Sequence, residues 1–278
     1  MPAGAETELL AGGKLIVDEP GEGVLRLTID NPSRRNALDE QILDAIATTL
    51  AAHAVKEPTD TRGRCVILTG ANGMFSAGYD IGQIDEGDFE RRAERLVAHP
   101  FTEAMEALDA HPNPTVAVLP GHAIGGGLEL ALACDLRLAE ATMKLGMPPG
   151  KLGLVYSHTG LRRFLDAIGA PRTRELFLLG RYIDAGTALT WGLVNWVCCA
   201  EKLESFSLEI AGELAANAPL AQRGNKRILR ALLSAEGALS PEVERELIEL
   251  RKASFASRDL REGMRAFTEK RAPAFEGR

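Results

Sequence analysis

Residues 120–138 read P-G-H-A-I-G-G-G-L-E-L-A-L-A-C-D-L-R-L, and the apolar run T-V-A-V-L at 115–119 comes directly before them. That run is typical of a buried strand, and good helix formers follow the glycines from Leu128 to Ala133. Glycines lack Cβ atoms, so the chain can turn sharply and a ligand can come close to the backbone. The stretch therefore predicts a strand, a tight turn and a helix whose first N–H groups face the turn.

One carboxylate, Glu129, falls in the first turn of this predicted helix. A glutamate can stand there because the helix dipole favours negative charge at its N-terminus. It can also be a catalytic acid or base beside N–H groups that stabilise an oxyanion. The stretch has neither G-x-G-x-x-G spacing nor a G-K-[ST] ending, which argues against dinucleotide and P-loop phosphate binding. The turn alone favours the first interpretation of Glu129, a glutamate placed by the helix dipole.

A second stretch upstream matches the first. Residues 64–70 read R-C-V-I-L-T-G, a predicted buried strand, and A-N-G-M-F-S-A-G-Y-D-I follows at 71–81. With the glycine turn, this loop resembles the crotonase (enoyl-CoA hydratase/isomerase) superfamily, which carries F-x-A-G-x-D-[IL] and x-G-G-G-x-E-[LM] in this order. The resemblance runs from about Lys14 to the end and includes R-E-G-M-R-A-F-T-E-K-R at 261–271.

The resemblance implies an α/β fold, a crotonase-like spiral of ββα units with a C-terminal helical region. It divides the chain into a flexible tail at residues 1–13, a core at 14–200 and a helical trimerisation region at 201–278. Members of this superfamily form trimers that often pair as hexamers, so we expect a homo-trimer or hexamer here.

Local patterns agree with that division. Residues 14–30 predict two strands around a P-G-E-G turn, and a helix is expected from a cap near Asp39 to about Val55. Two helices are expected at 161–168 and 171–179, and a strand at 192–197. From residue 201 the chain reads as almost entirely helical, with breaks expected at three residues: Pro219, Gly237 and Pro241.

Composition and charge are those of an ordinary globular protein, with 45% hydrophobic residues, 26% charged residues and a net charge of −7. No basic stripe suggests a nucleic-acid partner. The four cysteines show no C-x-x-C spacing, so neither a metal nor a redox cofactor is expected. No apolar run reaches the about 18 residues of a membrane span, and no signal-peptide pattern opens the chain. We expect a cytoplasmic protein without a membrane partner.

The resemblance also implies the chemistry and the site. An acyl-CoA enzyme must stabilise the thioester enolate, and the backbone N–H groups of Tyr79 and Gly126 match the superfamily's two oxyanion donors. Glu129 matches its catalytic glutamate, and coenzyme A enters as part of the substrate. Predicted contacts to coenzyme A and substrate are Arg34 or Arg35, Ala37, Ser76, Ala77, Asp80, Ile81, Gly125, Pro148, Pro149, Phe267 and Lys270. The last two are expected to serve a neighbouring subunit's site.

A second catalytic glutamate of the superfamily's hydratases is missing. It lies in a segment F-G-x-P-E-x-x-x-G, which here reads L-G-M-P-P-G-K-L-G at 145–153, with Pro149 in the glutamate's place. Proline has no ionisable group and cannot transfer protons. Two-glutamate hydration is therefore not expected, and a simple isomerase is disfavoured because those relatives usually keep this glutamate.

The same segment is similar to the methylmalonyl-CoA decarboxylase branch, which shows M-T-P-x-x-x-G-x-x-Y-x-x-x-G-L. Met147, Tyr156 and Gly160 fall in that register without a gap. In that branch the tyrosine points at the substrate carboxylate, and loss of CO₂ gives the enolate without a base. The branch carries His where Tyr79 stands, so the match is partial. Otherwise Tyr156 lines the pocket and its hydroxyl finds a partner. His158 is either a second group for proton transfer or an exposed turn residue before a helix, and the turn residue is the favoured expectation.

The first functional hypothesis is an acyl-CoA enzyme of the enoyl-CoA hydratase/isomerase family, a lyase of fatty acid metabolism, with Glu129 as its one acid–base glutamate. The alternative enzyme is a decarboxylase of a malonyl-type CoA ester that uses Tyr156. An alternative of another class is a non-catalytic acyl-CoA-binding protein. Retention of Glu129 and of both donor loops argues against that last alternative.

Overall fold

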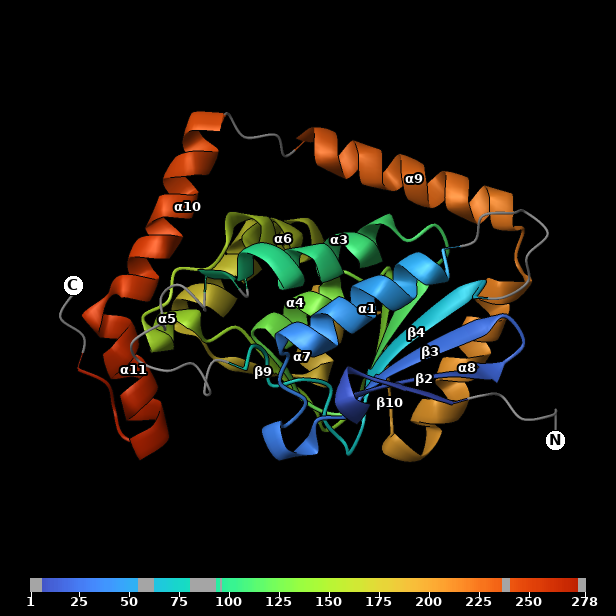
Figure 1. Ribbon diagram of the computed structural model, residues 1–278, viewed down its shortest axis with the longest axis horizontal. Helices are drawn as coiled ribbons and strands as arrows, with labels where there is room; N and C mark the ends of the chain where they lie inside the picture. Colours follow the sequence, from blue (N-terminus) through green and yellow to red (C-terminus); the bar gives the residue numbers. More distant parts are fainter. Residues whose placement is uncertain (1–6, 55–62, 81–93, 96, 237–240, 275–278) are drawn as a thin grey trace.

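The computed structural model describes residues 7–54, 63–80, 94–95, 97–236 and 241–274. A seven-stranded sheet lies at its centre, in the order β1-β2-β3-β4-β5-β7-β10 (Figure 1). The first three strands pair antiparallel, and every pairing from β3 to β10 is parallel. The strands are β1 (Glu8–Leu10), β2 (Leu15–Gly21), β3 (Val24–Ile29), β4 (Cys65–Gly70), β5 (Thr115–Leu119), β7 (Leu136–Glu140) and β10 (Trp196–Cys198).

A second, three-stranded sheet carries the glycine turn, in the order β6-β8-β9. Its strands are β6 (Ala123–Ile124), β8 (Lys144–Gly146) and β9 (Tyr182–Asp184). Short helical turns η1 (Ala11–Gly13), η2 (Pro32–Arg34) and η4 (Val97–Phe101) lie in the connections. The Gly125 N–H donates to the Gly146 carbonyl at 2.9 Å, which fixes the turn to β8.

Helices cover both faces of the large sheet (Figure 1). Apolar side chains of α1, α3, α4 and α6 form one core with the strands, and α8 packs on the other face against β4, β5 and β7. The helices are α1 (Glu40–Ala52), α3 (Thr102–Ala110), α4 (Gly126–Leu132), α5 (Pro149–Leu152), α6 (His158–Leu179), α7 (Ala185–Trp191), α8 (Ala200–Ala216), α9 (Pro219–Glu236), α10 (Pro241–Ala256) and α11 (Arg258–Glu269).

Several local predictions are confirmed. The strand at 115–119 has the predicted bounds, β2 and β3 form the predicted hairpin, and the Asp39 carboxylate caps α1 by accepting from the Ile42 N–H at 2.9 Å. The two helices predicted at 161–168 and 171–179 are both present within α6, which is divided by a kink at the non-helical Gly169. The α/β class and the helical C-terminal region are also confirmed.

The strand predicted at 192–197 is wrong over its first four residues. Gly192 ends α7 in the left-handed conformation, at φ 83°, and its N–H donates to α7 carbonyls. The strand therefore begins only at Trp196, where pairing with Leu138 of β7 starts. Val55, the expected end of the first helix, lies outside the described residues, and α1 ends at Ala52. Gly237, an expected break, also lies outside them.

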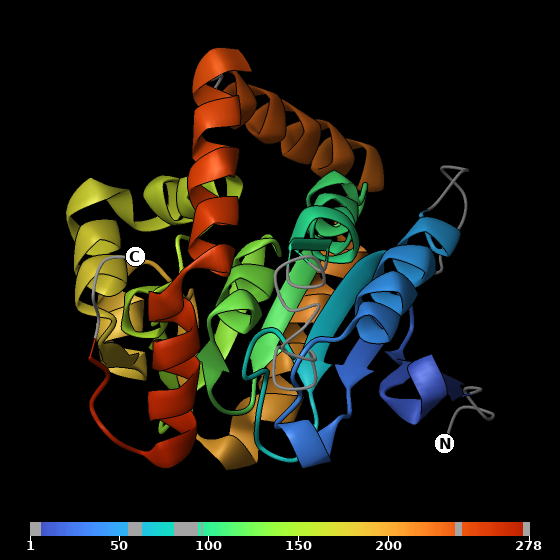
Figure 2. The same ribbon diagram turned by 60° about the vertical axis from the view of Figure 1, so that its left-hand side comes forward.

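The C-terminal helices α10 and α11 lie at the end of the molecule away from β1 (Figures 1 and 2). Contacts join α11 to α5 and α10 to α6. Glycines permit this packing, because a Cβ on Gly263 would lie 2.5 Å from the Leu152 carbonyl oxygen and one on Gly153 would lie 2.7 Å from Asp259 backbone. Within the described residues, no helix is long and apolar enough to cross a membrane.

Candidate active site

The loop after β4 lies directly against the glycine turn. A bridge between Ser76 and Ala123 holds it there, and a second bridge, between Leu38 and Tyr79, joins the same loop to the segment before α1. Gly78 adopts φ +97°, and a Cβ at this position would come within 2.8 Å of the Ile124 carbonyl oxygen and 3.3 Å of the Gly126 nitrogen. Only glycine allows the two loops to approach this closely.

The two predicted oxyanion donors, the N–H groups of Tyr79 and Gly126, are thus neighbours. Gly126 is the first residue of α4, so its N–H has no partner within the helix. The bridge at Tyr79 uses the Gly78 carbonyl and the Asp80 N–H. Among the described residues, no backbone carbonyl accepts from either predicted donor. The oxyanion role of these two N–H groups stays a prediction.

Glu129 lies one turn into α4 and is 2% exposed. The Tyr156 hydroxyl donates to Glu129 Oε2 at 2.5 Å, and the Nε of Arg163 lies 3.7 Å from Oε1. Burial raises the pKa of Glu129 to about 7, although the Tyr156 hydrogen bond and the Arg163 charge both oppose the rise. This carboxyl group can therefore give and accept protons near neutral pH.

Tyr156 lies between α5 and α6, with its ring edge-to-face with Phe177 at 5.4 Å between centroids. Burial and the neighbouring Glu129 charge raise the pKa of the phenol, so it remains a hydrogen-bond donor. The sequence predicts a hydrogen-bond partner for the Tyr156 hydroxyl without identifying it, and in the structure this partner is Glu129. The hydrogen bond is compatible with a pocket-lining role and with a role in the chemistry.

The Tyr79 side chain covers the glycine turn. A Cβ on Gly126 would meet the Tyr79 ring at 3.0 Å, and the ring is edge-to-face with Phe101 at 4.6 Å between centroids. The ring also packs on Phe255 of α10 and on α11. Burial and the Glu129 charge raise the pKa of this phenol, and the Tyr156 hydroxyl lowers it. Tyr79 thus lies close to the hydrogen-bonded pair of Tyr156 and Glu129, under the C-terminal helices.

Three residues surround this pair, and sequence reasoning misses two of them, Arg163 and Asp109. Gly160, on α6, would bring a Cβ to 2.6 Å from Tyr156 Cε1 and 2.8 Å from Glu129 Oε2, so any side chain here would displace the carboxylate. Arg163 follows on the same face of α6 and forms an ion pair with Asp109 of α3. Gly160 falls in the pattern shared with the methylmalonyl-CoA decarboxylase branch, whereas the i, i+3 spacing of Gly160 and Arg163 does not identify Glu129 or Asp109 as their partners.

The predicted coenzyme A residues are spread over several elements. Arg34 Nε lies 4.0 Å from Asp80 Oδ2, and Arg35 is exposed at φ 53°. Ala37 and Ser76 are buried, and the Ser76 hydroxyl accepts from the Gly78 N–H at 3.1 Å. Ala77 is partly buried and donates its N–H to the Arg35 carbonyl at 3.0 Å.

The remaining predicted contacts lie at the glycine turn and on the C-terminal side of the site. Gly125 precedes α4, and Pro148 and Pro149 begin α5, with Pro149 buried. Phe267 is 73% exposed near the end of α11, and Lys270 caps that helix. Ile81 lies outside the described residues. The binding roles of all these residues stay predictions.

His158 is not the exposed turn residue expected from the sequence. It is the first residue of α6 and its side chain is 16% exposed. Its Nε2 lies 3.7 Å from Glu244 on α10, and its buried Nδ1 has no hydrogen-bond partner among the described residues. The correction has a tertiary cause, because α10 folds over the start of α6.

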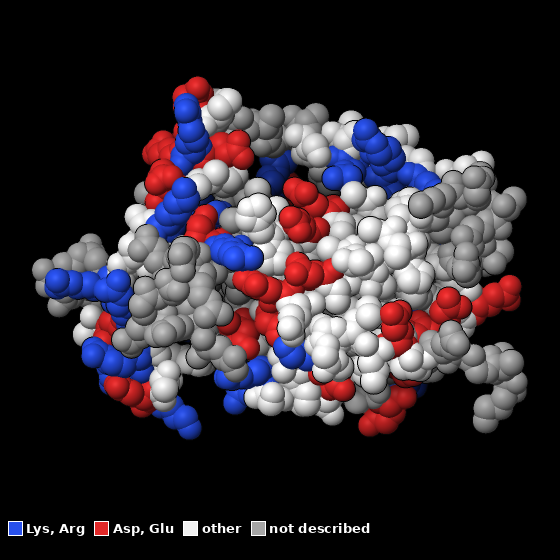
Figure 3. Space-filling view, in the orientation of Figure 1, with Lys and Arg blue, Asp and Glu red and all other residues white. Residues whose placement is uncertain are grey.

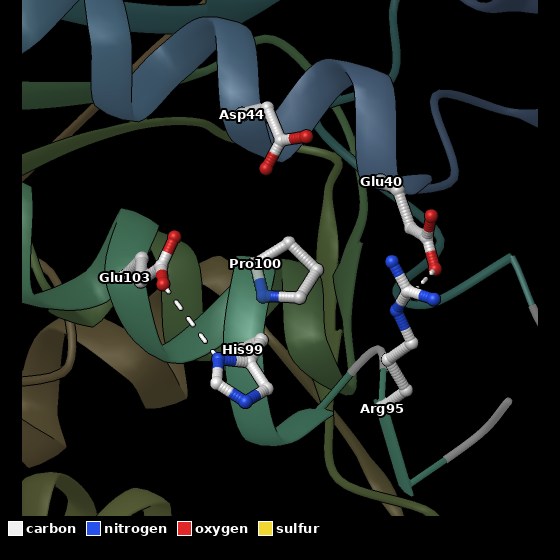
Figure 4. Close-up of a pocket in the computed structure, with 6 residues that line it drawn as sticks. All are labelled: Glu40, Asp44, Arg95, His99, Pro100 and Glu103. Atoms are coloured by element: carbon white, nitrogen blue, oxygen red, sulfur yellow. Dashed lines mark ion pairs between the residues drawn. The ribbon is translucent and has the colours of Figure 1, made fainter. Parts of the chain in front are cut away.

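An open groove of about 520 Å³ lies between α1 and η4 (Figure 4). Ion pairs join Arg95 to Glu40 at 3.9 Å and His99 to Glu103 at 3.7 Å. Asp44 and Pro100 complete the lining. None of these residues is a predicted site residue, and in the described part of the chain no group of three or more His, Cys, Asp or Glu could hold a metal.

Charges of both signs are spread over the face shown in Figure 3, with Lys and Arg gathered along α9. The α9 sequence supplies four of them: Arg223, Lys226, Arg227 and Arg230. Two are tied to the body, because Arg223 donates to Asn113 at 2.9 Å and Lys226 donates to Asp135 at 2.6 Å. These cations therefore anchor α9 in part, rather than forming a free basic stripe.

The chain is similar to known proteins over nearly its whole length. The enoyl-CoA hydratase/isomerase family model matches residues 19–278. A probable enoyl-CoA hydratase, echA8, from Mycobacterium tuberculosis is 35% identical, covering 95% of this chain and 98% of that protein. The 2,3-dehydroadipyl-CoA hydratase of Escherichia coli is 33% identical, covering 92% of this chain and 96% of that protein.

Two solved structures show the same fold. A methylmalonyl-CoA decarboxylase in complex with 2-nitronate-propionyl-CoA has a TM-score of 0.83 at 29% identity, covering 95% of this chain and 99% of that chain. An enoyl-CoA hydratase from Bacillus anthracis has a TM-score of 0.73 at 29% identity, covering 95% and 100%. The chain belongs to the enoyl-CoA hydratase/isomerase family of the crotonase superfamily.

Proposed function

We propose that this protein is an acyl-CoA enzyme, a lyase, that works through a thioester enolate with Glu129 as its one acid–base glutamate. The observation that carries the proposal is the Glu129 carboxyl itself. It is buried in the first turn of α4, the helix that begins at Gly126, and burial raises its pKa to about 7. A carboxyl group whose pKa lies near 7 transfers protons efficiently near neutral pH.

The proposed chemistry uses the donors and the carboxylate together. As a base removes the α-proton, negative charge moves to the thioester oxygen, and the N–H groups of Tyr79 and Gly126 stabilise it. One such donor is typically worth about 10²–10³ in rate. Ionised Glu129 accepts the proton, and protonated Glu129 returns it. With Pro149 in the place of the second glutamate, Tyr156 is the polar group that holds Glu129 in position.

The direct test is exchange of acyl-CoA α-protons into deuterated water, followed by mass spectrometry. The wild-type protein is expected to catalyse exchange on butyryl-CoA, and Glu129→Gln is expected to slow it by about 10²–10⁴. Glu103→Gln, an exposed glutamate on α3, is the matched control and should leave the rate unchanged. Exchange that persists in Glu129→Gln contradicts the proposal. Binding of acyl-CoA without any exchange would support the non-catalytic alternative.

A decarboxylase of a malonyl-type CoA ester is the second candidate. It is favoured by the likeness to methylmalonyl-CoA decarboxylase, at a TM-score of 0.83, and by the position of the Tyr156 hydroxyl beside Glu129. In this reaction the bond between the α-carbon and the carboxylate breaks, CO₂ leaves, and the electron pair forms the enolate. The enolate then takes a proton at the α-carbon.

A two-substrate panel separates the candidates. Purified wild type, Glu129→Gln and Tyr156→Phe are assayed on crotonyl-CoA and on methylmalonyl-CoA. Hydration of crotonyl-CoA that is lost in Glu129→Gln supports the first candidate and contradicts the decarboxylase. Release of CO₂ from methylmalonyl-CoA that depends on Tyr156 makes the decarboxylase the favoured candidate.

A further inference from the structure

Arg163 forms an ion pair with the buried Glu129 carboxylate. It stands on α6, three residues after Gly160, so both residues face α4. Its Nε lies 3.7 Å from Glu129 Oε1, and its Nη1 donates to the Asp109 carboxylate on α3. Three helices thus contribute one group each to a row that runs Asp109, Arg163, Glu129.

The Arg163 Nε is buried and has no hydrogen-bond partner among the residues that the structure describes. A buried donor without an acceptor typically costs about 1–3 kcal/mol, so it is an uncommon arrangement. The separation of 3.7 Å is too long for a hydrogen bond, but it is short for two opposite charges. A small movement of the ionised carboxylate toward Arg163 would give this donor its acceptor.

Each element around Glu129 brings one group to the carboxyl. Tyr156, just before α6, donates a hydrogen bond to it, and the Tyr79 phenol, on the loop after β4, lies close enough for the Glu129 charge to raise its pKa. Arg163 from α6 lowers the pKa of Glu129, and Asp109 from α3 raises it. The charges of Arg163 and Asp109 therefore shift the pKa of Glu129 in opposite directions, and burial raises this pKa in either case.

We propose that Arg163, anchored by Asp109, is a positioning residue that sets the protonation equilibrium of Glu129 and orients its ionised carboxylate. When Glu129 ionises, the Arg163 Nε–H becomes its second hydrogen-bond donor beside Tyr156. When Glu129 is protonated, Arg163 stays paired with Asp109 and releases Oε1. The proposal rests on the acid–base role proposed for Glu129, and neither Arg163 nor Asp109 needs to touch the substrate.

The test titrates the Glu129 carboxyl directly, by pH-difference infrared spectroscopy of its protonated C=O band. Glu129→Gln identifies the band by removing it. Arg163→Gln is expected to raise the midpoint by about one pH unit, because a cation that favours the ionised form is lost. Asp109→Asn is expected to lower it, because an anion that disfavours that form is lost. A role limited to packing does not move the midpoint in opposite directions.

Arg162→Gln is the matched control on the same helix. Arg162 pairs with Asp166 at 2.7 Å and makes no ion pair with Glu129 among the described residues. The midpoint of the Glu129 titration in Arg162→Gln should equal that of the wild type. Because Arg163→Gln can destabilise the fold by leaving Asp109 unpaired, Arg163→Lys and the double variant Asp109→Asn/Arg163→Gln are titrated as well. The lysine should raise the midpoint less than the glutamine does, and the double variant should fall between its single variants.

Midpoints that do not move, or that move in the same direction in Arg163→Gln and Asp109→Asn, overturn the proposal. So does an equal shift in Arg162→Gln. The titration needs no turnover, so its result is independent of the proposed function. Opposite shifts in a protein without α-proton exchange would support the positioning role and contradict the enolate chemistry. Unmoved midpoints with exchange lost in Glu129→Gln would support the enolate chemistry and contradict the positioning role.

Discussion

The fold buries the Glu129 carboxyl, although the ionised form of a carboxyl group is more stable in water. Its folded-state pKa of about 7 lies above the ordinary value of 4.5, so the native state binds the proton more tightly than the unfolded chain does. The stability that comes from the protonated form is complete below about pH 4.5 and is lost as the pH rises through about 7. The wild-type protein therefore loses part of its free energy of unfolding where the carboxylate is ionised.

We expect Glu129→Gln to gain stability relative to the wild type between pH 5 and pH 8, by about 2–3 kcal/mol in free energy of unfolding. Glutamine cannot ionise, so the variant does not lose the stability that the wild type loses when buried Glu129 ionises at high pH. Urea unfolding of both proteins at equal concentration at the two pH values measures the change. A difference between the proteins that is the same at pH 5 and pH 8 would contradict the raised pKa.

The same group predicts the pH dependence of the proposed reaction. Removal of an α-proton requires ionised Glu129, so the exchange rate should rise with pH and level off above about 7. Tyr156→Phe removes a donor that lowers the pKa of Glu129, and the midpoint of its rate profile should therefore lie higher. Exchange measured from pH 5 to pH 9 tests both expectations. A flat profile would show that another group is the base.

At the scale of elements, the contact between α6 and α4 depends on a residue without a side chain. We expect Gly160→Ala to lower activity strongly and to cost about 1–3 kcal/mol in stability, because the new Cβ would lie 2.8 Å from Glu129 Oε2. Thermal unfolding and the exchange assay measure the two effects.

Gly212→Ala on α8 is the matched control for this substitution. A Cβ at Gly212 would meet nothing within 4 Å, so the change should leave activity intact and gain about 0.5–1 kcal/mol from helix propensity. If both alanine variants keep full activity, the close packing of α6 on Glu129 is not needed for function.

At the scale of the whole molecule, α9 carries a row of apolar side chains that this chain does not cover. Leu220 is 69% exposed, and Ile228, Leu229 and Leu232 are each 59–60% exposed. A helix that leaves such a face open marks an interaction surface. This agrees with the trimer or hexamer expected from the family resemblance, which stays a prediction.

We expect Leu229→Glu to lower the oligomeric state, because a charge in an apolar interface loses its hydration without gaining a partner. Sedimentation velocity of the wild type and the variant measures this. Leu9→Glu is the control, an exposed leucine on β1 whose substitution should leave the sedimentation coefficient unchanged. A wild-type protein that sediments as a monomer would contradict the expectation.

Local sequence was enough for the parts of the site that are built from consecutive residues. The glycine turn, the start of α4 and the position of Glu129 follow from 120–138, because glycine conformation and helix capping depend on neighbours in the chain. The loop at 71–81 could be recognised for the same reason. That these two stretches lie side by side could be expected only from the family resemblance, since nothing in either stretch identifies the other.

Tertiary structure alone decided what surrounds Glu129. Asp109 and Arg163 are 54 positions apart, and Tyr156 and Glu129 are 27 apart, so no local pattern pairs them. The burial of His158 depended on α10, which lies far along the chain. By itself the sequence determined which groups can ionise and where the backbone can turn. The fold determined which charges face each other and how much water reaches them, and these two quantities set the pKa of Glu129.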